Sequence, residues 1–240
     1  LAVDIGASSG RVIAGDCGGG RLELHELHRF SNGAVEQKGS YHWDIESTFR
    51  EIKEGIRKAG LRGGRIVSIG VDTWGVDYAL LDAKCQLLGR PFAYRDSRTN
   101  GMMEEAFKRV PKRAMYDVTG IQFMFFNTVF QLLSEVVARR PELARAARLL
   151  FTPDLLNYWL SGRVVNEYTI ASTSQMLDAT SRTWAVAMLE KLGIPSRILG
   201  EIVLPGEKLA PLTPSLCQEL AVEPFNVVAV GSHDTASAVA

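Results

Sequence analysis

A turn of small residues near the start of the chain could hold a phosphate group. It follows Asp4 and consists of Gly6, Ala7, Ser8, Ser9, Gly10 and Arg11. Backbone N–H groups and hydroxyls of such a turn can close around a phosphate, and an acidic residue at the end of a strand can hold a hydrated Mg²⁺ nearby. The turn lacks the lysine of a Walker loop and precedes a predicted strand instead of a helix, so a plain turn between two strands also explains the pattern.

A second group of polar residues stands near the end of the sequence. Gly231, Ser232, His233, Asp234 and Thr235 follow a short apolar run that predicts a buried strand. An aspartate at the carboxyl end of such a strand faces the crevice where open sheets bind ligands, and there it can accept a proton from a substrate hydroxyl. The same Asp234 could instead cap the helix that follows, and a lone His233 is more often structural than catalytic.

A third polar segment, DTWGVD, occupies residues 72–77 between two apolar runs. A sugar needs directional partners for its hydroxyls and an aromatic surface for its apolar face, and the polar groups beside Trp74 suit both needs. Gly75 leaves bare backbone at this point, where a side chain could otherwise intrude. A β-turn built around Gly75 explains the segment nearly as well.

Two other conspicuous segments receive structural interpretations. Residues 95–98 carry charges of both signs and predict a solvated turn closed by salt bridges. The aromatic side chains of Phe123, Phe125 and Phe126 predict core packing rather than a ligand platform.

The elements that must position these residues begin with an antiparallel meander. Residues 1–5, 11–15 and 21–30 are predicted to be strands, joined by glycine-rich turns. Apolar residues then recur at spacings of three and four behind Asp44, which predicts a helix that ends near Gly60. Residues 66–71 and 78–81 predict further strands. This order is typical of α/β proteins with a mixed open sheet.

The middle of the chain is predicted to be helical. One helix follows Asn127 as its cap, another starts at Pro153, and a third includes residues 184–192 and ends at Gly193. Four prolines punctuate residues 199–225, which predicts a linker and a domain boundary near its end. Residues 227–230 predict a strand before the final helix.

Composition excludes several classes of protein. The chain has 240 residues, 46% of them hydrophobic, and 27 basic side chains balance 27 acidic ones. Disorder and nucleic-acid binding are therefore not expected, and no segment is apolar enough to span a membrane. The chain opens on an acidic strand without the basic start of a secretory signal, which predicts a cytoplasmic location. Three widely spaced cysteines indicate neither disulfides nor a zinc site.

Six segments together resemble the FGGY family of carbohydrate kinases. They read AVDIGASSGR, SIGVDTWGVDYALLD, PFAYRDSRTNG, GIQFMFFNT, LLNYWLSG and VVAVGSHDTASAV, and they occur in the family's order along nearly the whole chain. The resemblance implies an actin-like ATPase fold of the ribonuclease H-like type, with helices on both faces of the sheet. It also implies a sugar-binding lobe at residues 1–225 and the start of a nucleotide-binding lobe at residues 226–240.

The resemblance also implies partners and residue roles. ATP, with Mg²⁺ bound, would phosphorylate a ketose, and the first expectation is the 1-hydroxyl of L-rhamnulose. Kinases of the L-fuculose, xylulose or glycerol type are the alternatives within the family. A sugar-binding module without catalysis is another alternative. Asp234 would be the general base. Ala7, Ser8, Ser9, Gly10 and Arg11 would contact ATP, Gly75, His233, Asp234 and Thr235 would contact the sugar, and Asp4 would hold Mg²⁺.

Overall fold

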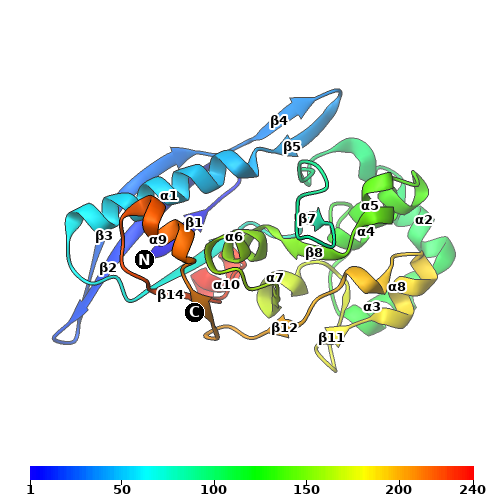
Figure 1. The fold of residues 1–240 in the computed structure, drawn as a ribbon. Helices are drawn as coiled ribbons and strands as arrows, with labels where there is room; N and C mark the ends of the chain where they lie inside the picture. Colours follow the sequence, from blue (N-terminus) through cyan, green and yellow to red (C-terminus); the bar gives the residue numbers. More distant parts are fainter.

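The computed structural model describes residues 1–240 and is organised around one mixed sheet (Figure 1). The sheet has six strands in the order β13-β14-β6-β1-β2-β3. Their bounds are Ala2–Ile5 (β1), Ser9–Gly18 (β2), Arg21–Ser31 (β3), Ser68–Thr73 (β6), Lys208–Pro211 (β13) and Asn226–Val228 (β14). β1, β2 and β3 form the predicted antiparallel meander, whereas β6 runs parallel to both β1 and β14. The mixed sheet is therefore confirmed.

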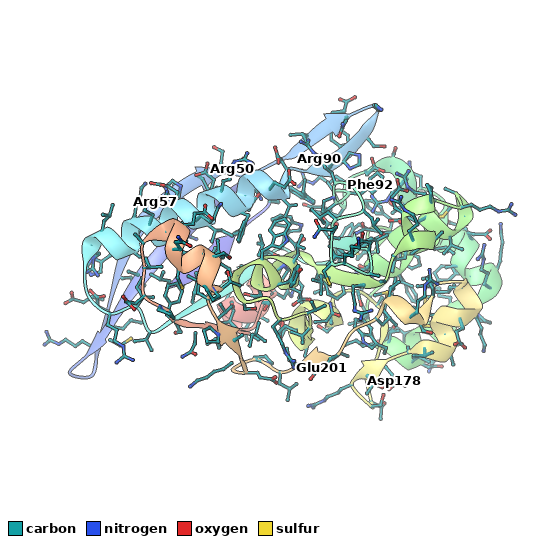
Figure 2. The ribbon with its side chains drawn as sticks, in the orientation of Figure 1. Arg50, Arg57, Arg90, Phe92, Asp178 and Glu201 are labelled. Carbon is teal, nitrogen blue, oxygen red and sulfur yellow. The ribbon has the colours of Figure 1, made fainter.

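One face of this sheet is covered by helices α1 (Ile45–Arg62), α6 (Thr152–Ser161) and α9 (Pro214–Leu220). Val3, Ile69 and Val71 point into this core, because alternate residues of a strand face the same side. Asp44 begins α1 as predicted, since its carboxylate accepts a hydrogen bond from the Ser47 backbone N–H at 3.2 Å. On the outer side of α1, Arg50 extends away from the sheet (Figure 2).

The opposite face of the sheet meets helix α10 (Asp234–Val239). Asp4 and Asp72 lie on this face, one residue out of phase with the buried Val3 and Val71. The residues predicted to do chemistry therefore stand on the face that α1, α6 and α9 leave open, and helices lie on both faces of the sheet.

A second apolar core fills the other end of the chain (Figure 1). The antiparallel pair of β7 (Tyr78–Leu81) and β8 (Arg148–Phe151) lies between the two cores and contributes side chains to both. The helices of the second core are α2 (Met102–Arg109), α3 (Lys112–Thr119), α4 (Thr128–Val137), α5 (Pro141–Arg145), α7 (Tyr168–Ser172) and α8 (Val186–Leu192). Short two-stranded pairs complete the structure: β4 (Ala34–Gln37) with β5 (Ser40–Trp43), β9 (Asn166–Glu167) with β12 (Ile202–Val203), and β10 (Leu177–Asp178) with β11 (Thr183–Trp184).

Several predicted local features differ from the structure. Trp184 belongs to β11 instead of α8, and its indole N–H donates to the Gly200 carbonyl at 2.8 Å. Asn127 precedes α4 as predicted but does not cap it, because its side-chain amide donates to the Gln175 side chain at 2.9 Å. Both differences arise because a distant segment offers a better partner than the local backbone.

The proline-rich residues 199–225 form part of the domain instead of a linker. They contain β12, β13 and α9, and Leu212, Leu216 and Phe225 are buried in the first core. β14 lies between β13 and β6, so a boundary after residue 225 would cut the sheet at a paired strand. The assignment of residues 226–240 to a second lobe stays a prediction, and this pairing counts against it.

The cysteines are free thiols at three separate places, with Cys17 exposed and Cys85 and Cys217 partly buried. None of the helices combines the length and the apolar character that crossing a bilayer requires.

Candidate active site

Three segments that are far apart in sequence meet at one edge of the sheet. β1 and β6 run parallel with Asp4 opposite Asp72, so their carboxyl ends lie together. Thr73 then continues the ladder beyond β6, because its backbone N–H donates to the Ser232 carbonyl at 3.0 Å and it bridges His233. Asp234 is thereby placed beside the ends of both strands.

Asp234 lies in the walls of two adjoining cavities. The first, here called the acidic cavity, has a volume of about 510 Å³. The second, here called the aromatic cavity, has a volume of about 540 Å³. Besides Asp234, the acidic cavity is lined by Asp4, Asp72, Thr235, Ser237 and Ala238. The aromatic cavity is lined by Trp74, Gly75, Val76, Tyr94, Ile121, Phe126, Asn127, Ser172, Thr173 and His233 in addition to Asp234.

The acidic cavity concentrates negative charge. Burial raises the pKa of Asp72 to about 7, and the charges of Asp4 and Asp234 add to this effect. Arg11 compensates part of the charge, because its Nε donates to Asp4 Oδ2 at 2.8 Å. A bound cation would relieve the remaining repulsion among the carboxylates.

The carboxylates do not form a complete metal cage. No group of three or more His, Cys, Asp or Glu side chains in residues 1–240 is arranged so that it could hold a metal ion. Magnesium that accompanies a nucleotide needs fewer protein ligands, because one or two carboxylates together with phosphate oxygens and water complete its six ligands. The donors present at Asp4 and Asp72 therefore fit a magnesium–nucleotide pair better than a resident metal.

Asp234 is the first residue of α10 and is partly accessible, with 37% of its side chain exposed. Its Oδ1 accepts hydrogen bonds from the backbone N–H of Thr235 at 2.6 Å and from the Thr235 hydroxyl at 3.2 Å. His233 Nε2 lies 3.4 Å from the same oxygen. All three neighbours are at Oδ1, so Oδ2 is the oxygen that can meet a substrate.

Aromatic side chains enclose the second cavity, but not in the predicted way. Trp74 is only 6% exposed and packs on Trp43 with 4.2 Å between ring centroids, so it belongs mainly to the core. The more accessible aromatic walls are Tyr94 and Phe126, whose ring centroids lie 5.6 Å apart. The prediction that Phe126 is only a core residue is therefore wrong.

The aromatic wall is fixed from behind by Asp77, which is fully buried. Its Oδ2 accepts hydrogen bonds from Trp43 Nε1 at 2.6 Å, Trp74 Nε1 at 2.9 Å and the Tyr94 backbone N–H at 3.1 Å. Its Oδ1 accepts one from Gln131 Nε2 at 3.0 Å. Burial raises the pKa of Asp77 to about 6, and these hydrogen bonds limit the rise because they favour the ionised form.

Gly75 lies where the chain turns past α7. A Cβ atom at Gly75 would come within 3.2 Å of the Thr173 side chain. The neighbouring Val76 N–H donates to the Thr173 hydroxyl at 3.0 Å, which holds the two segments together. The absence of a side chain at Gly75 thus serves packing against Thr173 as well as leaving space in the cavity.

The small-residue turn lies at the surface between β1 and β2, with Ser8 and Ser9 exposed. The Asn32 side chain holds it by donating to the Gly6 carbonyl at 2.8 Å. Packing explains the glycine at position 10, because a Cβ atom there would lie 2.3 Å from the Phe30 ring. None of the five predicted ATP contacts (Ala7, Ser8, Ser9, Gly10 and Arg11) lines either cavity, and the link to the site is the Arg11–Asp4 pair.

The turn at residues 95–98 has the predicted salt bridge, with 3.7 Å between Arg98 and Asp96, but the predicted solvation is wrong for Asp96, which is only 2% exposed. Its carboxylate accepts hydrogen bonds from the backbone N–H groups of Tyr41 at 2.9 Å and Arg98 at 3.0 Å. Arg98 turns inward and donates to Gln131 Oε1 at 2.5 Å. The sequence shows the charged residues Asp96 and Arg98, but it does not show that the backbone N–H of the distant Tyr41 binds the Asp96 carboxylate.

Sequence reasoning also missed Glu167, which is 1% exposed and accepts a hydrogen bond from the Ser232 backbone N–H at 3.1 Å. No spacing or composition signal marks it, because an acidic residue in a polar segment is usually solvated.

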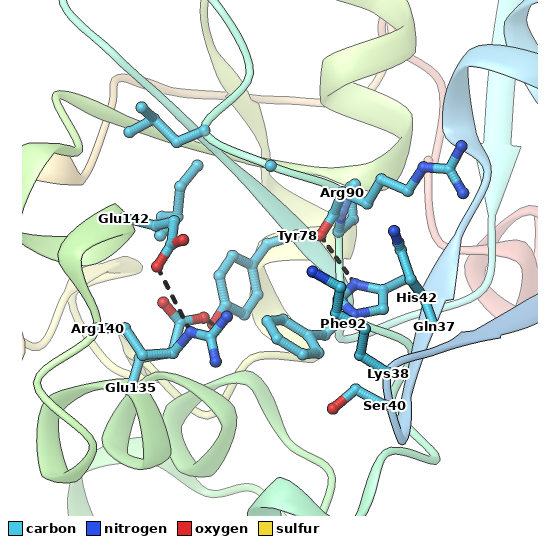
Figure 3. Close-up of a pocket in the computed structure, with 14 residues that line it drawn as sticks. Gln37, Lys38, Ser40, His42, Tyr78, Arg90, Phe92, Glu135, Arg140 and Glu142 are labelled. Carbon is cyan, nitrogen blue, oxygen red and sulfur yellow. Dashed lines mark hydrogen bonds and ion pairs between the residues drawn. The ribbon is translucent and has the colours of Figure 1, made fainter.

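A third cavity, of about 550 Å³, shares no lining residue with these two. It lies beside the β4–β5 hairpin, where Phe92 packs against His42 and Arg140 (Figure 3). Arg140 also faces Glu142 with 3.6 Å between charged atoms, and Tyr78 donates a hydrogen bond to Glu135. These two pairs satisfy four of its polar side chains, and none of the predicted site residues lines this cavity.

Comparison with known structures defines the class of the fold as actin-like. The structure superimposes on a xylulose kinase from Lactobacillus acidophilus with a TM-score of 0.82 at 18% identity, covering 98% of this chain and 48% of that one. A gluconate kinase from the same organism gives 0.83 at 17% identity, covering 97% and 47%. At these identities the likeness shows the fold alone.

The sequence narrows this class to a family. Residues 1–240 match the N-terminal domain of the FGGY family of carbohydrate kinases, and the chain belongs to that family. It is 44% identical over 239 residues to a rhamnulokinase of Oceanobacillus iheyensis, with 100% of this chain and 51% of that protein covered. A rhamnulokinase of Bacteroides thetaiotaomicron is 43% identical over 240 residues, with 100% and 50% covered. The chain thus spans about half the length of these relatives.

Proposed function

We propose that the protein transfers a phosphoryl group from ATP to a ketose, with Asp234 as the general base. The position of Asp234 between the two cavities carries this proposal. A sugar in the aromatic cavity and a magnesium-bound nucleotide at the acidic cavity would both reach this residue.

The chemistry follows from what phosphoryl transfer needs. The reaction requires an acceptor hydroxyl held in line with the γ-phosphate and a group that removes the hydroxyl proton. Asp234 Oδ2 would accept that proton, and His233 and the backbone at Gly75 would hold the sugar hydroxyls. Thr235, predicted to contact the sugar, lines the acidic cavity and would instead orient Asp234 through its two hydrogen bonds to Oδ1. Magnesium, held by Asp4, would neutralise charge on the phosphates. The exposed turn of residues 7–11 would meet ATP, and the Arg11–Asp4 pair would connect it to this cation.

The acceptor is proposed to be L-rhamnulose, phosphorylated at its 1-hydroxyl. This rests on relatives named rhamnulokinase that share 40–44% identity over the whole chain. L-Fuculose, xylulose and glycerol remain alternatives within the family. The sequence-based expectation of a cytoplasmic location agrees with a substrate such as ATP and stays a prediction.

The test is sugar-dependent ADP release by the complete polypeptide that contains these residues. We expect turnover with L-rhamnulose and little with glycerol, because a site built to pair several hydroxyls loses those partners with a smaller acceptor. A preference for xylulose or glycerol would keep the family and reject the proposed acceptor. Sugar binding without ADP release would instead favour a non-catalytic sugar-binding module.

A further inference from the structure

The turn that carries Asp234 is held from two sides. β6 holds it through the Thr73 backbone, and α7 holds it through side chains. The Ser232 N–H donates to Glu167 Oε2 at 3.1 Å, and the His233 N–H donates to the Thr169 hydroxyl oxygen at 3.2 Å. Two consecutive backbone donors immediately before Asp234 are thus bound by two side chains of one short segment.

Glu167 also determines the orientation of the Thr169 hydroxyl. That hydroxyl donates to Glu167 Oε2 at 2.6 Å, so its proton is committed and its lone pairs face the His233 N–H. Oε1 accepts from the Thr169 backbone N–H at 2.8 Å, and Oε2 also accepts from the Ile170 N–H at 3.1 Å. Hydrogen bonds to an ionised carboxylate are stronger than neutral ones, and linked bonds polarise one another.

Glu167 is itself held in place by a buried carboxylate behind it. Asp154 Oδ1 accepts a hydrogen bond from the Glu167 backbone N–H at 3.0 Å, and Asp154 Oδ2 accepts one from Asn166 Nδ2 at 3.0 Å. Asp154 and Glu167 are 3% and 1% exposed, so water does not compete for these bonds. The connection is therefore dry at Asp154 and Glu167, and it becomes partly accessible at Thr169 and His233.

The same segment reaches the aromatic cavity. Ser172 ends α7 and Thr173 follows it, and both line that cavity. Thr173 accepts the hydrogen bond from Val76 described above. One short helix therefore contacts the Asp234 turn at its start and the Gly75 turn at its end.

We infer that Glu167 and Thr169 are positioning residues, which fix the direction of Asp234 toward the acceptor hydroxyl held in the aromatic cavity. The inference rests on the proposed function, in which Asp234 removes the hydroxyl proton. Neither residue lines a cavity, so both act through the turn and not on the substrate. Misplacing a reacting group by about 1 Å can cost ~10²-fold in rate, which is the size of effect this arrangement prevents.

The sharpest test is Thr169→Val in the complete polypeptide, because valine keeps the shape and removes the hydroxyl. We expect kcat with the sugar to fall about 10- to 100-fold while the KM for ATP stays within about twofold. Thr169→Ser restores the hydroxyl and should return kcat to within about threefold of the wild type. Thr119→Val is the matched control, since it removes a buried hydroxyl that donates to the Met115 carbonyl at 2.9 Å and that lines neither cavity.

Backbone amide exchange supplies a readout that does not depend on turnover. Thr169→Val should speed exchange at His233, and Glu167→Gln should speed it at Ser232, because an amide nitrogen would then face N–H donors. Glu167→Gln perturbs a buried group and could fail to fold, in which case the Thr169 pair decides the matter. If Thr169→Val keeps both wild-type kcat and wild-type amide protection, the inference is wrong. If the wild type shows no sugar-dependent turnover, the proposed function fails. Amide exchange would still test whether Glu167 and Thr169 hold the backbone N–H groups of Ser232 and His233.

Discussion

The three carboxylates around the acidic cavity differ in what surrounds them. Asp4 is paired with Arg11, and burial beside two other acids raises the pKa of Asp72 to about 7. Asp234 is bound at one oxygen and open at the other, and it alone reaches both cavities. A general base must touch the hydroxyl it deprotonates, so Asp234 is the member of the group suited to that role.

The first prediction concerns Asp234→Asn in the complete polypeptide. The amide keeps the shape but cannot accept the proton, so kcat should fall by roughly 10²- to 10⁴-fold while sugar affinity stays near normal. Steady-state kinetics and sugar binding measure the two quantities. Asp178→Asn, in β10 and outside the lining of both cavities, is the control (Figure 2). Near-normal turnover of Asp234→Asn would reject the base assignment.

The second prediction concerns the pH dependence of stability through Asp77. Its folded-state pKa is raised to about 6 from 3.8, so between these values the folded chain binds more protons than the unfolded chain. Asp77 should therefore lower the free energy of unfolding by roughly 3 kcal/mol as the pH rises from about 4 to 6, in addition to the decrease that the raised pKa of Asp72 contributes up to about pH 7. Urea unfolding at several pH values measures it, and Asp77→Asn should show a smaller decrease than the wild type between pH 4 and 6. Parallel profiles for the two chains would contradict the prediction.

At the scale of elements, the site depends on the contact between the turn after β6 and the end of α7. Gly75 permits the contact because its Cβ position is already close to Thr173. The hydrogen bond from Val76 to Thr173 then fixes the spacing. The shape of the aromatic cavity is thus set by two segments that are nearly one hundred residues apart in sequence, Val76 and Thr173 being separated by 97.

The third prediction is that Gly75→Val raises the KM for the sugar and leaves the KM for ATP unchanged. The branched side chain must displace Thr173 or enter the cavity, and overpacking of about 1–3 kcal/mol corresponds to a rise of about ten- to hundredfold in the KM for the sugar. The KM for ATP should stay unchanged. The double variant Gly75→Val with Thr173→Ala separates the two causes, since recovery of sugar affinity would attribute the loss to Thr173. An effect on the KM for ATP alone would contradict the prediction.

At the scale of the whole molecule, two apolar cores support one site at their junction. The first core holds the sheet with Asp4 and Asp72. The second holds α4 and α7, with Phe126 in the turn before α4 and Thr173 directly after α7. Both cavities open to solvent in these 240 residues. Phosphoryl transfer needs water to be excluded, and a closing partner lobe would provide this.

The fourth prediction is that the 240 residues alone do not phosphorylate sugar. The acidic cavity is open to solvent in these residues, so ATP would remain solvated there. ADP release by the purified 240-residue chain should stay at background under conditions in which the complete polypeptide turns over. ATP-dependent sugar phosphorylation by this chain, with contaminating kinases excluded, would contradict the prediction.

The sequence by itself determined the features that depend on local order. Alternation and glycine turns predicted the meander, and a short apolar run predicted the strand at residues 78–81. Asp44 before a helical pattern predicted α1. These patterns arise from neighbours in the chain. The ordered match of six segments also predicted the family correctly. The candidate residues Asp4, Gly75, His233 and Asp234 were named from their positions after apolar runs, and they do meet at one edge of the sheet.

Tertiary structure alone decided which polar groups are buried and which aromatics line a cavity. Asp96 and Glu167 are buried because distant backbone N–H groups bind their carboxylates, and sequence spacing carries no record of such partners. Phe126 lines a cavity although residue type predicted core packing, and Trp74, which lines the same cavity, is only 6% exposed. Burial and direction depend on what covers a side chain, and the covering segments come from elsewhere in the chain.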